Sequence, residues 1–336
     1  MMIDAPTLHR DAIVIDAVCP LVKQPGAFVD WYVEGGCTAI APTVAAWEDA
    51  TFAIRNIGAW LDFIARRDDL RLIRFAADIE AAKAAGQLGI VLHFQGTDPI
   101  GDDLNLVTLY KALGVGVMQL AYNVRNRIGD GAQERSDSGL SRFGMDFVKR
   151  CNRDRVIVDC SHTGYRTTME AIALSERPVI FSHANPRAVH PSPRNITDEQ
   201  IKAVAETGGT VGVVGFPGFV STSARPTLAQ FIAHIDHIAG LVGIDHVSLG
   251  IDYFAGQHPV MDDAAARKRY ESLVAAGLWE PDGYPPPPYY YPEGIETPRT
   301  LQNLTAGLAA HGYGEADIRK VLGGNLMRVY RAVWGG

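Results

Sequence analysis

Short apolar runs rich in Val, Ile and Phe recur along the chain, and stretches of helical periodicity separate most of them. This alternation is typical of parallel strands joined by crossover helices. The pattern predicts nine strands, at residues 12–18, 37–44, 71–76, 89–95, 115–122, 156–162, 178–184, 210–216 and 246–252. Nine such runs favour a closed (β/α)8 barrel, an α/β fold, with one additional strand at its edge.

The signals that begin and end helices agree with this interpretation. Asp102-Asp103 and Thr197-Asp198-Glu199 precede helical stretches, and Gly follows several of these stretches just before the next strand. The competing architecture is a doubly wound open sheet, but its glycine-rich phosphate-binding motif is absent after the first predicted strand. We therefore expect a single barrel domain over residues 1–336, with residues 300–336 forming C-terminal helices that pack on the barrel.

One segment interrupts the alternation. Residues 277–299 contain a run of prolines and four tyrosines, which is too irregular for a helix and too long for an ordinary connection. This loop insertion is either a rigid surface loop or subunit contact, or a lid over the site. The second interpretation arises because the segment follows the last predicted strand, and barrel active sites lie at the carboxyl ends of strands.

The composition excludes several classes of protein. With 336 residues, of which 47% are hydrophobic and 21% charged, the chain can bury a large core and is neither disordered nor a coiled coil. Its 31 basic and 38 acidic residues give a net charge of −7, so we expect no nucleic-acid partner. The sequence contains no apolar leader, no uninterrupted apolar run of the ~18 residues that a membrane span needs, and no CxxC spacing. We expect a cytoplasmic protein with reduced thiols and no membrane contact.

Polar residues stand at the carboxyl ends of several predicted strands, directly after their apolar positions. In a barrel these ends share one rim, where active sites form. The residues at this rim are Gln95, Tyr122, Asn123, His162, His183 and Asp252. Their recurrence in strand after strand is hard to explain by packing alone, so the rim is the candidate active site.

Two histidines at this rim suggest a metal ion. His162 and His183 are 21 residues apart, which is one strand–helix–strand unit, so both imidazoles should reach the same side of the barrel mouth. Two imidazoles suit Zn²⁺, with a carboxylate as third ligand and water in the fourth position. Asp252 is the available carboxylate, and it could instead act as the base on water. His93 lies two residues before Gln95, on the same face of the strand. It is a third ligand, a substrate contact or an interior histidine.

Further residues are candidates for substrate contacts. Arg194 follows His183 in a loop at the same rim and is either a surface arginine or a bidentate clamp on a substrate carboxylate. Tyr122 is either a structural aromatic residue or a hydrogen-bond donor to a developing oxyanion. Gln95 and Asn123 lie beside these groups as candidate substrate-binding residues.

Five segments resemble the renal (membrane) dipeptidase family of zinc metallopeptidases in the amidohydrolase superfamily. The resemblance runs from about residue 85 to the end and includes the segments LAYNVRNRIGDGAQERSDSGLSRFG, VIVDCSHTGYRTTMEA, PVIFSHANPRAVHPSPRN, HVSLGIDY and ADIRKVLGGNLMRVYRAVWG. It implies a barrel fold, a homodimer and the hydrolysis of dipeptides. It also implies that His162 and His183 bind the second zinc of the family, that Arg194 holds the terminal carboxylate of the substrate, and that Asp252 lies near the scissile amide.

The chain departs from the family around the first zinc. Family members end the first strand with Asp-Gly-His-Asn-Asp, whose His and second Asp are ligands, whereas this chain has Asp16-Ala17-Val18-Cys19-Pro20. Gln95 replaces the bridging glutamate, and Tyr122 replaces a histidine thought to contact the tetrahedral oxygen. His9-Arg10-Asp11 imitates the lost ligand pattern but precedes the strand, at the opposite end of the barrel. Two Zn²⁺ ions repel strongly without anionic ligands between them, so we predict one ion, at His162 and His183, and the loss of the other site, which corresponds to the first zinc of the family.

These observations together predict a metal-dependent hydrolase with one zinc ion. The ion is held by His162 and His183 and completed by Asp252, Gln95 or His93. The expected substrate is a small amide or dipeptide-like molecule with a carboxylate. Two alternatives stay open: a mononuclear amidohydrolase-type enzyme for a non-peptide amide, lactam or carboxylic acid, and a catalytically silent barrel kept as a binding protein.

Overall fold

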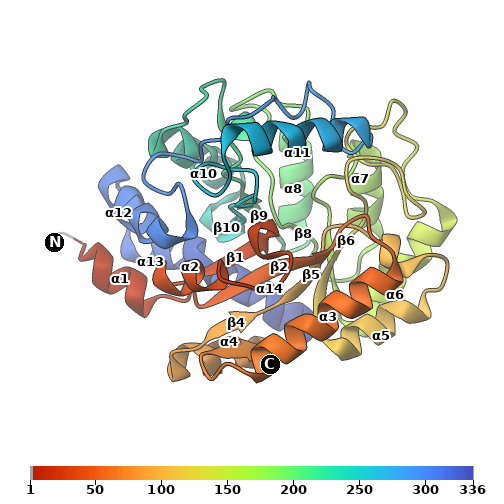
Figure 1. Cartoon of the computed structure of the whole chain (residues 1–336), viewed down its shortest axis with the longest axis horizontal. Coiled ribbons are helices and arrows are strands. Elements are labelled where there is room, and N and C mark those ends of the chain that lie inside the picture. The colour runs from red at the N-terminus through yellow and green to blue at the C-terminus, as the bar shows by residue number, and fades with distance from the viewer. Residues whose placement is uncertain (1–2, 336) are drawn as a thin grey trace.

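The computed structural model describes residues 3–335, and parallel strands surrounded by helices dominate it (Figure 1). The strands are β1 (Ile15–Cys19), β2 (Ala39–Ala45), β3 (Leu70–Leu72), β4 (Leu88–Ile90), β5 (Leu92–Phe94), β6 (Val115–Gln119), β7 (Ile157–Asp159), β8 (Ile180–Phe181), β9 (Thr210–Val213) and β10 (Val247–Leu249). Each of the nine predicted runs therefore overlaps a strand. The run at 89–95 contributes to two short strands, β4 and β5, because its first half pairs with β3 and its second half with β6.

Helices follow most strands and cover the outside of the sheet (Figure 1). They are α1 (Ala5–Asp11), α2 (Val29–Glu34), α3 (Ala50–Ala65), α4 (Ala76–Ala85), α5 (Asn105–Leu113), α6 (Arg142–Asp154), α7 (Tyr165–Leu174), α8 (Asp198–Glu206), α9 (Pro217–Val220), α10 (Leu228–Val242), α11 (Asp263–Ala275), α12 (Gln302–His311), α13 (Glu315–Arg319) and α14 (Asn325–Trp334). The expected start signal before α8 is a capping box, in which the Thr197 side chain accepts a hydrogen bond from the Gln200 amide.

The strands form a curled parallel sheet in the order β10, β9, β8, β7, β6, β5, β2, β4, β3, and β1 also pairs with β2. Two contacts join the carboxyl ends of β1 and β10. The Asp16 carboxylate accepts a hydrogen bond from the Ile251 amide (2.9 Å), and the Leu21 amide donates to the Tyr253 carbonyl (2.8 Å). With β4 and β5 as two parts of one barrel position, eight positions surround the axis and β3 lies at the edge. The predicted (β/α)8 architecture is confirmed.

From β3 onward, the strands end earlier than the apolar runs predict. Tyr122 and His162 each lie three residues beyond the last residue of their strand, and Asp252 lies three residues beyond β10. Asn123, His162 and Asp252 have positive φ angles of 60°, 63° and 62°. Residues other than glycine rarely adopt this left-handed backbone, which occurs mostly where a surrounding site requires it. The candidate residues therefore lie on sharp bends after the strands rather than on the strands themselves.

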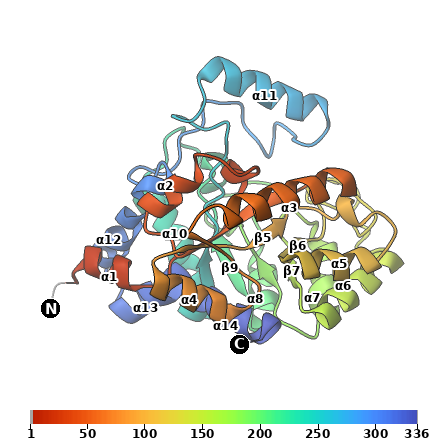
Figure 2. The same cartoon turned by 60° about the horizontal axis from the view of Figure 1, so that its bottom comes forward.

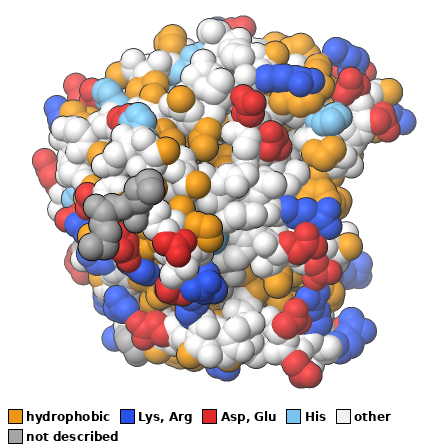
Figure 3. Space-filling view, turned by 90° about the vertical axis from the view of Figure 1, so that its left-hand side faces the viewer, with side chains coloured by type: hydrophobic (Ala, Val, Ile, Leu, Met, Phe, Trp, Pro, Cys, Tyr) orange, Lys and Arg blue, Asp and Glu red, His pale blue; other side chains and the backbone are white. Residues whose placement is uncertain are grey.

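Helix α11 stands outside the ring of barrel helices and is joined to it by long loops (Figure 2). The loop after it contains the Pro/Tyr-rich segment. At the other end of the chain, α14 packs on the strands, and its Trp334 indole donates to the Gly116 carbonyl (3.1 Å). Every helix within residues 3–335 is too short or too polar to cross a lipid bilayer. Acidic and basic side chains are interspersed on the face that Figure 3 shows.

The buried carboxyl group that joins β1 to β10 predicts a pH-dependent stability. Burial raises the pKa of Asp16 to about 7, although the Ile251 and Val18 amides act in the opposite direction. The folded protein then holds a proton that the unfolded chain has released, so the free energy of unfolding should fall as the pH rises from about 4 to 7. Asp16→Asn keeps an acceptor for Ile251 but cannot ionise. Between pH 5 and pH 8, we expect the wild type to lose about 2 to 3 kcal/mol more than this variant, measured by urea unfolding. Equal losses in the two proteins would contradict the assignment.

Candidate active site

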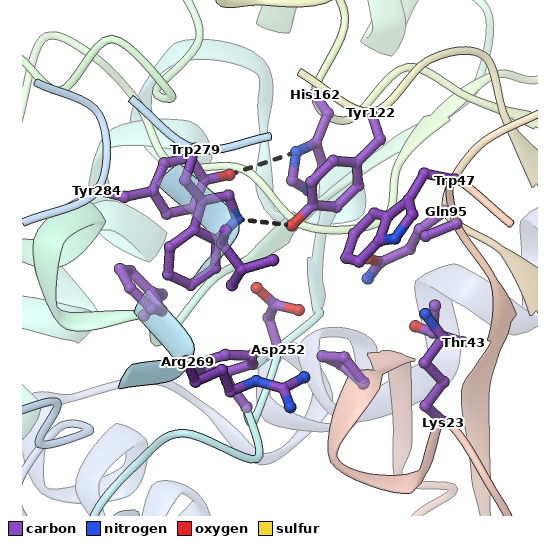
Figure 4. A pocket seen from close by; sticks show the side chains of 15 residues that line it. Lys23, Thr43, Trp47, Gln95, Tyr122, His162, Asp252, Arg269, Trp279 and Tyr284 are labelled. Atoms are coloured by element: carbon purple, nitrogen blue, oxygen red, sulfur yellow. Dashed lines mark hydrogen bonds between the residues drawn. The ribbon is translucent and has the colours of Figure 1, made fainter. Parts of the chain in front are cut away.

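The pocket at the carboxyl ends of the strands brings together four of the predicted residues. Gln95, Tyr122, His162 and Asp252 line a cavity of about 50 Å³ (Figure 4). This volume has room for only a few water molecules. The other walls come from the loop after β2, from α11 and from the Pro/Tyr-rich segment.

The two rim histidines face one another. His162 and His183 follow the paired strands β7 and β8, and their Nε2 atoms lie 2.7 Å apart. Burial lowers the pKa of both rings, to about 3 for His183, so both imidazoles are neutral near pH 7. The predicted convergence of the two rings is present in the structure.

The hydrogen bonds behind the rings determine which nitrogen of His162 carries the proton. The Asn123 amide nitrogen donates to the Leu278 carbonyl (2.8 Å), which orients the amide so that its oxygen faces His162 Nδ1 at 2.7 Å. This oxygen can only accept, so His162 Nδ1 must be protonated. The Nε2 atom of His162 therefore presents a lone pair.

The same reasoning applies to His183. The Ser182 hydroxyl donates to the Asp159 carboxylate, so its oxygen accepts the hydrogen bond from His183 Nδ1 at 2.7 Å. His183 Nε2 then also presents a lone pair. Two unprotonated Nε2 atoms 2.7 Å apart repel each other unless a cation binds both of them. The network thus presents both Nε2 atoms in the form that a metal ion requires.

Asp159, which the sequence analysis did not single out, is the centre of this network. Its carboxylate accepts hydrogen bonds from the amide and hydroxyl of both Ser161 and Ser182. Burial alone would raise the pKa of Asp159, but His93, His183 and Ser182 hold it at about 2. The available signal was the Asp-x-Ser-His spacing, in which the carboxylate is placed to accept from the serine that follows it.

His93 is not with the pocket residues. It is completely buried, and its Nε2 atom lies 3.2 Å from the Asp159 carboxylate without the alignment of a hydrogen bond. The ring does not line the pocket. The structure therefore places His93 beneath the site, where it supports the Asp159 carboxylate.

Asp252 lies in the pocket, and its carboxyl group has a raised pKa. Burial raises its pKa to about 8, the nearby Arg194 guanidinium acts against this rise, and the Asp16 carboxylate adds to it. The carboxyl group is therefore mostly protonated near pH 7. In this state it can give a proton, and it can take one only after a nearby cation has lowered its pKa.

Tyr122 stacks on the His162 ring, with ring centroids 4.1 Å apart. Its hydroxyl oxygen accepts a hydrogen bond from the Trp279 indole (3.0 Å), which leaves the hydroxyl proton free to donate into the pocket. Burial raises the pKa of this phenol, so the proton is retained. A neutral donor beside the metal-ligand candidates is suited to a developing oxyanion.

The Pro/Tyr-rich segment covers these residues. Trp279 and Tyr284 stack on each other with ring centroids 4.2 Å apart, and both line the pocket (Figure 4). The Tyr284 hydroxyl accepts a hydrogen bond from Arg194 Nε (2.9 Å) and contacts Asn123. Side chains of residues 277–299 therefore form part of the wall of the pocket.

Arg194 does not line this first pocket. It is 3% exposed, and together with His162 it lines a second recess of about 320 Å³. His162 is thus reached from two cavities, with Arg194 in one and Asp252 in the other. A substrate carboxylate held by Arg194 would lie in the second recess.

The residues fit one metal ion better than two. Val18 and Pro20 have no ligating atom, and Gln95 offers a neutral amide where two cations would need a bridging carboxylate. No group of three or more His, Cys, Asp or Glu side chains in residues 3–335 is arranged to hold a metal ion. Neither Asp252 nor His93 is therefore arranged with His162 and His183 as a third ligand, and the pair itself offers two imidazole ligands.

Comparison with known proteins agrees with the fold. The model of the membrane dipeptidase family (peptidase family M19) matches residues 32–284 and 280–334. An amidohydrolase structure from Pseudomonas aeruginosa is 33% identical and superposes with a TM-score of 0.89, covering 99% of this chain and all of that one. A metallopeptidase from Rhodobacter sphaeroides, liganded with a phosphinate mimic of the dipeptide L-Ala-D-Ala, is 22% identical with a TM-score of 0.79, covering 96% of this chain and 100% of that one.

A curated relative from Klebsiella pneumoniae, an uncharacterized protein in the pqqA 5′ region, is 27% identical over 275 residues. That alignment covers 79% of this chain and 89% of the relative. The family match extends over nearly the whole length and includes both rim histidines. The chain therefore belongs to the membrane dipeptidase family, a family of metal-dependent hydrolases.

Proposed function

We propose that this protein hydrolyses the amide bond of a small, carboxylate-bearing, peptide-like substrate with one metal ion held by His162 and His183. The observation that supports this proposal is the 2.7 Å distance between the two Nε2 atoms, both of which the hydrogen-bond network leaves unprotonated. Hydrogen bonds that the Nδ1–H groups of the two rings donate to Asn123 Oδ1 and Ser182 Oγ hold both rings in the ligating tautomer. Such an arrangement is unfavourable without a cation and favourable with one.

Bound zinc supplies Lewis acidity toward a carbonyl oxygen and toward water. Around it, Tyr122 donates a hydrogen bond to the oxygen of the scissile carbonyl as negative charge develops there. Burial alone keeps Asp252 protonated, and a cation bound beside it would lower its pKa. The ionised carboxylate would then accept the proton of the attacking water and pass it to the leaving nitrogen, so that it ends each turnover as it began. Arg194 holds the substrate carboxylate and so orients the amide at the histidine pair.

A second candidate function is the hydrolysis of a non-peptide amide or lactam. It is favoured by Gln95, Val18 and Pro20, which stand where the family resemblance implies ligands that handle a dipeptide. The two candidates share the same metal and the same proton transfers. They differ in the acyl half of the substrate.

Metal analysis combined with a substrate panel tests the proposal. The protein is loaded with zinc and dialysed, its metal content is measured by mass spectrometry, and dipeptides, N-acyl amino acids and lactams are incubated with it. We expect one equivalent of zinc per chain and hydrolysis of at least one carboxylate-bearing amide. Two equivalents would contradict the account of Gln95, and one equivalent without any turnover of the panel would favour a silent binding protein.

A further inference from the structure

A cation without an anionic partner lies at the rim of the pocket. Arg269 on α11 lines the same cavity as Asp252 and Gln95 (Figure 4). Within residues 3–335 its guanidinium makes no hydrogen bond or ion pair, and it lies over the face of Phe254, 5.0 Å from the ring centroid. The residue is exposed, so this guanidinium is at the open rim of the cavity, where a ligand can reach it.

Two neighbouring cations have partners within the protein. Lys23, on the same pocket wall, is paired with the Glu48 carboxylate and lies 4.5 Å from the centroid of the Trp47 ring. Arg267, on the same helix as Arg269, donates to the Pro287 carbonyl (3.2 Å). Among these three cations, only Arg269 directs unused hydrogen-bond donors toward the cavity.

The charge balance of the pocket favours an anion. The charge of Lys23 is cancelled by Glu48, whereas Arg269 has no carboxylate partner within residues 3–335. Its donors are therefore available to a ligand, and the planar fork of a guanidinium matches a carboxylate.

The positions of two arginines suggest how long the substrate is. Arg194 and Arg269 line different cavities, and His162 lines both of them. A molecule whose scissile amide lies at His162 would extend one end toward each arginine. We propose that Arg269 is a specificity-determining residue that binds a second carboxylate, on the acyl half of the substrate, so that the preferred substrates are amides with an acidic group at each end. This inference rests on the proposed function, in which Arg194 holds the first carboxylate.

The test uses two probes that differ only in the distal acid. N-Succinylglycine has a carboxylate on each side of its amide, and N-succinamoylglycine has a neutral amide in place of the distal carboxylate. Both are titrated calorimetrically into zinc-loaded wild type, Arg269→Gln, Arg269→Lys and Lys268→Gln, and product formation is measured in parallel. Lys268 is exposed, adjacent to Arg269 and outside the pocket lining, so its variant controls for the loss of one charge from α11.

We expect the wild type and Lys268→Gln to prefer the dicarboxylate by about 10- to 100-fold in Kd, or in kcat/KM where the amide is cleaved. Arg269→Gln should reduce this ratio to about 1 and leave the monocarboxylate unaffected, while Arg269→Lys should keep part of the preference. Equal affinity for the two probes, an unchanged preference in Arg269→Gln, or no measurable binding of either probe would overturn the inference. Preference without hydrolysis would overturn only the proposed function, and hydrolysis without preference would overturn only the role of Arg269.

Discussion

Replacing His162 or His183 with alanine should leave the protein without its metal ion and reduce hydrolysis on the order of 10³-fold or more. One imidazole remains in each variant, and no group of three potential ligands exists elsewhere in residues 3–335 to compensate for the loss. Lewis-acid stabilisation by a bound metal contributes several kcal/mol to the barrier, and each 1.36 kcal/mol corresponds to about tenfold in rate. Metal content and initial rates on the substrate found in the panel measure the two effects.

The matched control is His311→Ala. His311 is an exposed histidine that pairs with Asp236 far from the rim, and such a surface pair contributes only about 0 to 1 kcal/mol. This variant should retain one equivalent of zinc and full activity. Zinc should also raise the Tm of the wild type and of the control but not that of the two rim variants, because only a folded site that binds the ion is stabilised by it. A rim variant that keeps its zinc would refute the assignment of ligands.

The strands of this protein could be predicted because they are buried on both faces. Runs such as those at β6 and β10 are almost continuously apolar, which is the signature of parallel strands beneath helices. The ends of the strands were less well predicted, since apolar residues such as Leu120 and Ile251 continue beyond the last residue of the strand. They stay buried in the bends that carry Tyr122 and Asp252.

The candidate site was predicted in its residues but not in its geometry. The position of His162 after an apolar run indicated a rim residue, yet its left-handed backbone depends on the surrounding packing. Asp159 was overlooked because a carboxylate within a strand pattern gives no local sign that four donors from two loops will converge on it. The contacts of Trp279 and Tyr284 with Tyr122 and Arg194 join positions 90 to 157 residues apart, and a single sequence contains no signal for such pairs.

The second large effect that we expect is that of replacing Asp159. Asp159→Asn keeps the size of the side chain but turns one of its two oxygens into a donor, which opposes the amide and hydroxyl donors of Ser161 and Ser182. The Ser182 hydroxyl then no longer has a carboxylate as its acceptor, and it can donate to His183 Nδ1 instead. His183 would change to the tautomer with its proton on Nε2, the atom that faces His162.

This change should weaken zinc binding by about 10- to 100-fold, the usual effect of removing a partner that orients a metal ligand. It should also destabilise the fold by about 3 to 5 kcal/mol, because both serines lose a buried ionised acceptor and His93 loses its anionic neighbour. Competition with a chelator measures the affinity, urea unfolding measures the stability, and ¹⁵N chemical shifts of His183 in the metal-free protein report the tautomer.

Asp154→Asn separates these effects from the general cost of losing a paired carboxylate. The Asp154 side chain is 9% exposed and paired with Arg153 at the end of α6, away from the pocket. We expect this variant to lose some stability and to bind zinc as the wild type does. If Asp159→Asn lost only stability, with its zinc affinity and its His183 tautomer unchanged, Asp159 would be a structural carboxylate and the two lone pairs at the rim would need another explanation. If the tautomer and the affinity change together, the orientation of the histidine pair originates in a buried carboxylate that touches neither the substrate nor the ion.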